Sequence, residues 1–279
     1  MQNQEAKLFI IATPLGHRED ITLRALDTLR ALRVLFAEDT RETKKLLTLH
    51  GIPLSDLRLF SSALHNLDKA NEKALEFLRN GQSVGVLCDR GTPGISDPGA
   101  ELVRQAHSEG FAVIPIPGVS SVTTLISVSG VTQFSFVGFL PHKAKDRQAL
   151  WERSEKAGLA LLFFESPQRV RKTASEIRER FPAGRLFVGR EMTKVFEEYR
   201  WHALSDLLPE ALPEQGEYSL LLDFGAATTA AVEAGDLDSE IASRLSSDKE
   251  WAKRLAPLFG LSSQEIYNRL QRAKSERKP

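Results

Sequence analysis

The sequence has little that would support a disulfide framework, a metal cluster or a membrane span. Its one cysteine, Cys88, excludes an internal disulfide and any multi-cysteine zinc site, so we expect a reduced, cytoplasmic setting. The six histidines are scattered and no H-E-x-x-H pattern occurs, so we expect no metal. No apolar run reaches the length of a membrane span or a signal segment, so we expect no membrane association.

Excess charge and nucleotide-binding signatures are also missing. Lys plus Arg (37) balances Asp plus Glu (37), which argues against an overall basic nucleic-acid binder but allows a local basic patch. The chain has no G-x-G-x-x-G after a strand and no P-loop, which disfavours a nicotinamide enzyme and a nucleotide hydrolase. What remains is globular material, 42% hydrophobic and 27% charged, long enough for two domains and a small module.

The first 130 residues alternate between strand-like and helix-like stretches. Short apolar runs predict five strands, at 7–12, 34–37, 57–60, 84–88 and 112–116. Helical spacing and capping residues predict helices at 20–33, 41–50, 66–80, 98–108 and 119–129. Asn66 is expected to cap the third of these helices. This alternation is typical of a parallel sheet covered on both faces, which binds ligands beyond the carboxyl ends of its strands.

A second unit follows from about residue 133. We expect its strands at 134–139, 159–164, 186–189, 197–201 and 218–224, and its helices at 143–156 and 168–180. The sequence therefore predicts an N-terminal α/β domain (1–119), a C-terminal α/β domain (120–225), a linker of small residues (226–235) and a helical module with a basic tail (236–279). The core of this module is helix-turn-helix-like, with Gly260 at the turn and Ser262 as the cap of the second helix.

Polar residues and glycines gather directly after the predicted strands. CDRGTPGISDPG (88–99) opens a helix, its glycines allow a ligand to approach the backbone, and Asp89 could accept hydrogen bonds. PIPGVSS (115–121) brings hydroxyls and amides to a helix start, and EDTR (38–41) brings two acids to a strand end. Capping alone could also explain parts of these patterns, with Asp97 and Thr40 as caps.

Eight segments in this order carry a family resemblance: TPLGHREDIT, AEDTR, CDRGTPGISDPG, PIPGVSS, FVGFLP, FFESPQRV, REMTKVFEE and QGEYSLLL. From Leu8 to about Leu222, the chain resembles the bacterial 16S ribosomal RNA (cytidine) 2′-O-methyltransferases, within the tetrapyrrole (corrin/porphyrin) methylase superfamily. The resemblance implies a five-stranded parallel N-terminal sheet, a mixed C-terminal sheet and a homodimer. It also implies methyl transfer from S-adenosylmethionine to a cytidine ribose of 16S rRNA in the small ribosomal subunit.

The resemblance also assigns site residues. Cofactor binding is expected at Pro14, Asp89, Gly91, Thr92, Pro93, Gly118, Ser120, Ser121, Phe164, Met192, Gly216 and Glu217. Substrate binding is expected at His17, His65, Asn66, Glu165 and Lys194. Glu38 and Asp39 are the candidate bases for the ribose hydroxyl, and Arg41 would position a phosphate or orient these acids.

Some positions depart from the family pattern, and other functions stay open. His17 stands where the family usually has Asn, Arg90 where it has a small residue, and Leu67 where it has Glu. One alternative is a methyltransferase of the same fold that acts on a tetrapyrrole or another non-RNA substrate, including a modified protein histidine. A second is a non-catalytic RNA-binding protein in which Arg90 blocks the cofactor loop. A third, a DNA-binding regulator built around the terminal helices, leaves the first 225 residues unexplained.

Overall fold

The computed structural model describes residues 6–63, 66–95, 99–225, 248–249, 252–253 and 262–275. Residues 1–225 form one compact unit, and residues 226–279 form a second. The expected linker at 226–235, His65, and the expected helix cap Asp97 lie outside the described residues. None of the helices within these ranges has the length and apolar character of a membrane span.

The first sheet contains the five strands expected in the N-terminal half. They are β1 (Lys7–Ile11), β2 (Val34–Ala37), β3 (Arg58–Ser61), β4 (Val84–Leu87) and β5 (Ala112–Ile116). The strand order is β3-β2-β4-β1-β5, and every neighbouring pair is parallel. The predicted parallel sheet is therefore confirmed, and the carboxyl ends of all five strands lie along one edge.

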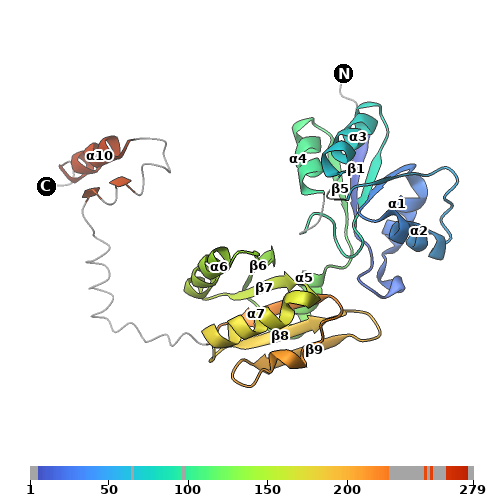
Figure 1. Cartoon of the computed structure of the whole chain (residues 1–279). Coiled ribbons are helices and arrows are strands. Elements are labelled where there is room, and N and C mark those ends of the chain that lie inside the picture. The colour runs from blue at the N-terminus through green and yellow to red at the C-terminus, as the bar shows by residue number, and fades with distance from the viewer. Residues whose placement is uncertain are drawn as a thin grey trace. The chain divides into compact units, whose positions relative to one another are not determined.

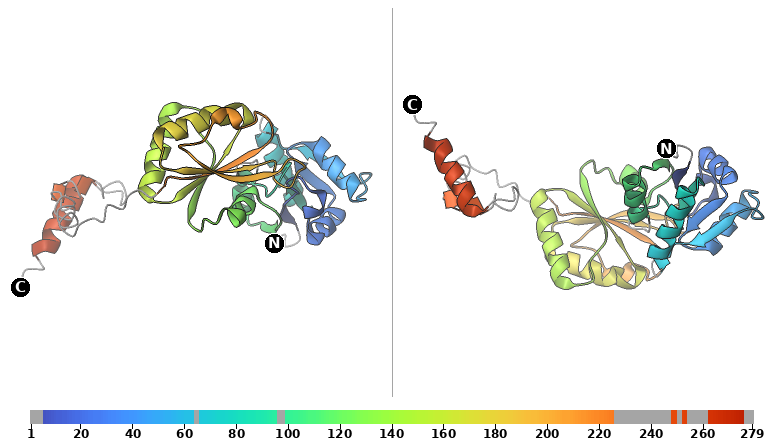
Figure 2. Two further views of the ribbon diagram at one scale, coloured as in Figure 1. Left: turned by 90° about the horizontal axis from the view of Figure 1, so that it is seen from below. Right: turned by 90° about the horizontal axis from the view of Figure 1, so that it is seen from above.

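Helices cover both faces of this sheet (Figure 2). Its helices are α1 (Leu23–Ala31), α2 (Thr40–Leu49), α3 (Leu67–Arg79) and α4 (Ala100–Ser108). Leu29 of α1 and Leu47 of α2 pack against one face, while Leu75 of α3 and Leu102 of α4 pack against the other. This arrangement explains the almost continuous apolar character of β2 and β4, which are buried on both sides.

The starts of all four helices differ by one to three residues from the expectation. α2 is capped by Asp39 and not by Thr40, which is its first helical residue. α1 begins three residues later than predicted, because Thr22 accepts a hydrogen bond from the Ala25 amide and a short 3-10 turn precedes it. Asn66 does precede α3, but its side chain makes no capping hydrogen bond, so its predicted role as a side-chain cap is wrong.

The second sheet is mixed, as expected. Its strands are β6 (Phe134–Phe139), β7 (Ala160–Glu165), β8 (Arg185–Arg190), β9 (Glu198–Ala203) and β10 (Tyr218–Asp223), in the order β6-β7-β10-β8-β9. β6 pairs with β7 in parallel, and the other three pairs are antiparallel. The accompanying helices are α5 (Ser121–Ser129), α6 (Ala144–Ala157) and α7 (Pro167–Arg180).

Alternation along the central strands divides the second core into two layers. Leu161 and Phe163 face α6 and α7, which lie on the same side of the sheet (Figure 1). Leu162 faces the opposite layer, where it packs with Leu125 of α5 and with Leu15, which follows β1. A period of two residues places successive side chains of a strand on opposite faces. Leu15 thus joins the edge of the first sheet to the core of the second.

In the unit of residues 226–279, the long described element is α10 (Ser263–Ser275). Ser262 and Glu265 form a reciprocal cap, in which the Glu265 amide donates to the Ser262 hydroxyl (3.3 Å) and the Ser262 amide donates to the Glu265 carboxylate (3.0 Å). The expectation that Ser262 caps a helix is confirmed. The turn expected at Gly260 lies outside the described residues.

Candidate functional site

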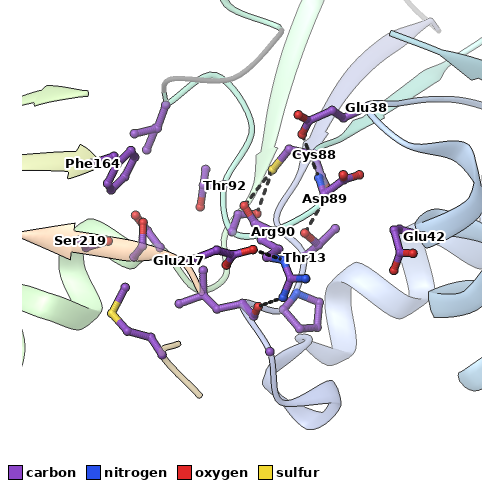
Figure 3. Close-up of a pocket in the computed structure, with 18 of the residues that line it drawn as sticks. Thr13, Glu38, Glu42, Cys88, Asp89, Arg90, Thr92, Phe164, Glu217 and Ser219 are labelled. Atoms are coloured by element: carbon purple, nitrogen blue, oxygen red, sulfur yellow. Dashed lines mark hydrogen bonds and ion pairs between the residues drawn. The ribbon is translucent and has the colours of Figure 1, made fainter. Parts of the chain in front are cut away.

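A cavity of about 770 Å³ opens where the carboxyl ends of the first sheet meet the second sheet. Figure 3 shows side chains from both sheets around it. Segments that follow four strands of the first sheet form one wall together with one face of α2. The other wall is formed by β6, β7, β10 and the turn after β8. The lining residues include Thr13–Gly16, Glu38, Glu42, Cys88–Thr92, Ser120, Ser121, Phe139, Phe164–Pro167, Met192 and Gly216–Ser219.

Hydrogen bonds join the loops of the first wall to one another. Thr13 and Gly91 exchange two backbone hydrogen bonds, at 2.8 and 3.0 Å, and the Thr13 hydroxyl donates to the Cys88 carbonyl at 3.1 Å. The Thr92 hydroxyl donates to the Val119 carbonyl at 3.0 Å. The segments that follow β1, β4 and β5 are therefore held as one surface, which orders the cavity wall before any ligand binds.

Gly118 is needed for the close approach of two of these segments. A Cβ atom at position 118 would lie 2.7 Å from the Cβ atom of Ala12, a separation that two methyl groups do not tolerate. Gly118 does not itself lie in the described cavity wall, but it sets the path of the chain into Ser120 and Ser121, which do. Its role is to position that wall.

We expect Gly118→Ala to lower the free energy of unfolding by about 1–3 kcal/mol, because the added methyl group overpacks the site. The displaced Ser120–Ser121 segment should also bind a cavity ligand less tightly. The matched control is the double variant Ala12→Gly/Gly118→Ala, which moves the methyl group from one segment to the other and should regain part of the stability. Thermal unfolding of both variants measures the change in stability. A Gly118→Ala variant as stable as the unaltered chain would contradict the steric explanation.

Three carboxylates gather at the ends of β2 and β4. The Asp89 amide donates to the Glu38 carboxylate at 3.3 Å, and the Asp39 amide donates to the Asp89 carboxylate at 2.9 Å. Glu38 and Asp89 line the cavity, whereas Asp39 turns to α2, where it accepts hydrogen bonds from the Arg41 amide (2.8 Å) and guanidinium (2.6 Å). The crossed bonds fix the positions of both cavity carboxylates.

The different surroundings of these three acids shift their pKa values in different directions. Burial raises the pKa of Glu38, and the neighbouring Asp89 and Asp39 carboxylates raise it further, against a lowering hydrogen bond from the Asp89 backbone. Burial likewise raises the pKa of Asp89. Hydrogen bonds from Arg41 lower the pKa of Asp39 to about 2. Glu38 is therefore the stronger base of the two residues predicted for that role.

The wall from the second sheet is aromatic. A register shift in β6 occurs between Phe136 and Phe139, and Gly138 there has a φ of +68°. The irregularity brings Phe139 beside Phe164, with ring centroids 5.5 Å apart, and Phe136 packs edge-on against the same ring at 5.0 Å. With Leu15 and Met192, Phe139 and Phe164 give the cavity an apolar side opposite the carboxylates.

The cavity brings together most of the residues expected to bind a cofactor. Ten of them lie in its wall: Pro14, Asp89, Gly91, Thr92, Ser120, Ser121, Phe164, Met192, Gly216 and Glu217. Pro93 and Gly118 are not in the described part of the wall. Of the three catalytic candidates, Glu38 lies in the wall, whereas Asp39 and Arg41 pair with each other beside it.

The expected substrate residues lie in different surroundings. The His17 ring caps the short 3-10 turn at Glu19, and the His17 amide donates to the Thr193 hydroxyl at 3.0 Å. Lys194 pairs with Glu191 and Glu217. The Glu165 side chain has no exposed surface, although the residue borders the cavity. Asn66 is not part of the described cavity wall.

Sequence reasoning missed three contributions to this cavity. One face of α2, made by Glu42, Lys45, Leu46 and Leu49, lines it, and their helical spacing is the signal that could have found them. Phe139 enters through an irregularity in β6 that the strand pattern does not show. Arg90 forms an ion pair with Glu217, 127 positions away in the sequence, and no local pattern reveals that pairing.

The fold and the cavity wall correspond to a known family. The model of the tetrapyrrole (corrin/porphyrin) methylases matches residues 7–207, a range that contains the first wall of the cavity and all of the second wall except Gly216–Ser219. The chain belongs to the tetrapyrrole methylase family. The solved structure of diphthine synthase is similar to this tetrapyrrole methylase, with a TM-score of 0.63 and 12% sequence identity. The match covers 78% of this chain and 90% of diphthine synthase. This likeness shows the fold.

Curated relatives are more similar in sequence to this tetrapyrrole methylase. A protein of Neisseria meningitidis serogroup B named ribosomal RNA small subunit methyltransferase I is 40% identical over 194 residues, which are 69% of this chain and 66% of that protein. A protein of the same name from Mesorhizobium japonicum is 37% identical over 275 residues, which are 95% of this chain and 92% of that protein. The second match extends into the C-terminal unit.

Proposed function

We propose that this chain transfers a methyl group from S-adenosylmethionine to the 2′-hydroxyl of a cytidine ribose in the 16S rRNA of the small ribosomal subunit. The observation that carries the proposal is the partly buried Glu38 in a cavity at the strand ends of a tetrapyrrole methylase fold. The names of the curated relatives, with up to 43% identity, support the choice of small-subunit rRNA.

The cavity residues fit S-adenosylmethionine chemically. The volume of the cavity, about 770 Å³, falls within the range of pockets that enclose a ligand of this size. Phe139, Phe164 and Leu15 offer an apolar surface for an adenine ring, and the hydroxyls of Ser120 and Ser121 offer partners for a ribose. The carboxylates of Glu38 and Asp89 offer negative charge near a cationic sulfonium. We therefore infer that these residues hold the cofactor.

The chain's own groups then have separate tasks in the reaction. The bound cofactor supplies a methyl group already activated on sulfur. The cavity walls align the ribose oxygen with that methyl group, and such alignment provides much of the rate. Glu38 accepts the proton of the 2′-hydroxyl as the oxygen attacks, since a ribose hydroxyl is a poor acid and needs a base. Asp89 keeps the Glu38 carboxylate in place through its backbone amide, 3.3 Å away.

The raised pKa of Glu38 gives a pH prediction. Only the deprotonated carboxylate can accept the hydroxyl proton, so kcat should rise with pH as Glu38 loses its proton. Because burial raises this pKa, the midpoint of the acid limb should lie above the pKa of an unperturbed glutamate. Measuring kcat across pH, with saturating cofactor and subunits, tests this. In Glu38→Asp the midpoint should move, and an unchanged acid limb would exclude Glu38 as the titrating group.

The setting of the protein completes the proposal. We infer that it acts in the cytoplasm on the small subunit or its rRNA, as a homodimer and without a metal ion. Within the part of the chain that the structure describes, no group of three or more His, Cys, Asp or Glu side chains is arranged to hold a metal. The net charge of zero means that rRNA contacts must come from local basic surface, such as Arg269 on α10.

Methyl transfer from labelled S-adenosylmethionine separates the candidate substrates. The chain is incubated with small subunits lacking this modification, with protein-free 16S rRNA, and with a tetrapyrrole as the non-RNA substrate. We expect label in the subunits or the rRNA and none in the tetrapyrrole. Label in the tetrapyrrole alone would overturn the choice of substrate. Absence of cofactor binding in calorimetry would instead favour a non-catalytic protein.

A further inference from the structure

Arg90 reaches across the cavity from the first sheet to the second (Figure 3). It follows β4, and its guanidinium Nε lies 2.8 Å from the Glu217 carboxylate, which stands just before β10. Its Nη1 donates to the Leu15 carbonyl at 2.9 Å. Both Arg90 and Glu217 line the cavity. A positive and a negative group therefore stand side by side in the wall, one from each sheet.

Glu217 is held firmly on its own side of the cavity. Its second carboxylate oxygen lies 3.1 Å from the Lys194 ammonium, and its amide donates to the Glu191 carboxylate at 2.9 Å. Lys194 also pairs with Glu191 at 2.8 Å, and both of these side chains are only 18% exposed. Glu217 therefore has a second charged partner, Lys194, on its own side of the cavity.

Arg90 retains capacity to bind another group. Its side chain is 42% exposed and that of Glu217 is 57% exposed. Among the residues that the structure describes, Arg90 Nη2 has no hydrogen-bond partner. Exposed ion pairs contribute little to stability, so a ligand that offers both charges can share or replace this pair at small cost.

The paired charges select the kind of group that fits. A guanidinium binds carboxylates through two parallel hydrogen bonds, and a carboxylate binds an ammonium. A polyanion such as an RNA phosphate backbone would be repelled by Glu217 where it is attracted by Arg90. An α-amino acid end, which carries both charges on one carbon, matches both partners together.

We propose that Arg90 and Glu217 form the subsite for the amino-acid end of S-adenosylmethionine, with Arg90 at its carboxylate and Glu217 at its ammonium. This inference rests on the proposed function, because it requires that the cavity binds this cofactor. In this proposal Arg90 helps to bind the cofactor, whereas the alternative of a non-catalytic protein has Arg90 block the cofactor loop.

Calorimetry with two probes tests the subsite on the full chain. S-adenosylhomocysteine carries the amino-acid end, and 5′-methylthioadenosine has the same adenine and ribose without it. Arg90→Met should weaken S-adenosylhomocysteine binding about 10-fold or more, the usual value of hydrogen bonds to a charged group, and leave 5′-methylthioadenosine binding unchanged. Glu217→Gln should also weaken S-adenosylhomocysteine binding and leave 5′-methylthioadenosine binding unchanged. The control is Arg30→Met, which removes an exposed arginine paired with Asp27 at 3.0 Å and should alter neither probe.

The possible results separate the inference from the proposed function. Selective loss of S-adenosylhomocysteine affinity supports the subsite. Equal loss of both probes, unchanged affinity, or tighter binding in Arg90→Met overturns it while the cofactor site stands. Loss of small-subunit binding with normal S-adenosylhomocysteine affinity also overturns it and assigns Arg90 to phosphate. If the unaltered chain binds neither probe, the proposed function and the subsite fail together.

Discussion

Replacing Glu38 with glutamine is expected to lower kcat by about 10²- to 10⁴-fold, the usual contribution of a general base. Glutamine keeps the size of the side chain and can still accept the hydrogen bond from the Asp89 amide, so the cavity wall should persist. Affinity for S-adenosylhomocysteine, which has no sulfonium charge to pair with Glu38, should therefore change little. The loss would arise because the glutamine amide cannot take the ribose proton.

The matched control for Glu38→Gln is Asp39→Asn. Asp39 is the N-cap of α2, and asparagine caps helices as well as aspartate does, so stability should be retained. Because Arg41 already holds the Asp39 carboxylate, we expect kcat in this variant to fall far less than in Glu38→Gln. Steady-state kinetics and cofactor calorimetry on both variants give the comparison. A large loss in Asp39→Asn with near-normal turnover in Glu38→Gln would reverse the assignment.

Glu165→Ala is expected to lower the free energy of unfolding by about 3 kcal/mol, because it removes one partner of a buried ion pair. The Glu165 carboxylate accepts hydrogen bonds from the Ser166 amide (2.8 Å) and the Thr173 hydroxyl (2.7 Å), and it lies 3.2 Å from the Arg169 guanidinium. These contacts tie the end of β7 to α7. The loss should lie at the low end for buried pairs, because Arg169 keeps its hydrogen bond to the Leu140 carbonyl.

This prediction decides between two roles for Glu165, which the family resemblance assigns to substrate binding. Urea denaturation of the full chain, followed by circular dichroism, measures the stability. Glu165→Gln, which preserves the shape and most of the hydrogen bonds, should lose less. If Glu165→Ala were as stable as the unaltered chain but had a raised KM for subunits, the residue would bind substrate and the structural role would be wrong.

The fold could be predicted from the sequence because local patterns and the topology agree. Apolar runs such as VLFA (34–37) and VGVL (84–87) specify strands buried on both faces, and helical stretches between them require parallel crossovers. The rule that ligands bind beyond the carboxyl ends of such strands then brings Glu38 and Asp89 to one place. The structure has them linked by a backbone hydrogen bond.

The finer properties of the site depend on tertiary contacts that local patterns do not contain. EDTR offers two acids, and only the direction of each side chain separates a cavity carboxylate, Glu38, from a helix cap, Asp39. Glu165 ends an apolar strand like a cavity residue, yet Thr173 and Arg169 of the next helix enclose it. Such distinctions come from packing between elements, which sequence periodicity does not encode.

Mapping the methylated nucleoside shows whether methyl transfer at this cavity modifies a ribose oxygen. Small subunits lacking the modification are incubated with the chain and S-adenosylmethionine carrying a deuterated methyl group. Their 16S rRNA is then digested to nucleosides for mass spectrometry. We expect ribose methylation, seen as deuterated 2′-O-methylcytidine that is nearly absent with Glu38→Gln. A deuterated methyl group on a base, or no label in rRNA despite measurable cofactor binding, would contradict it.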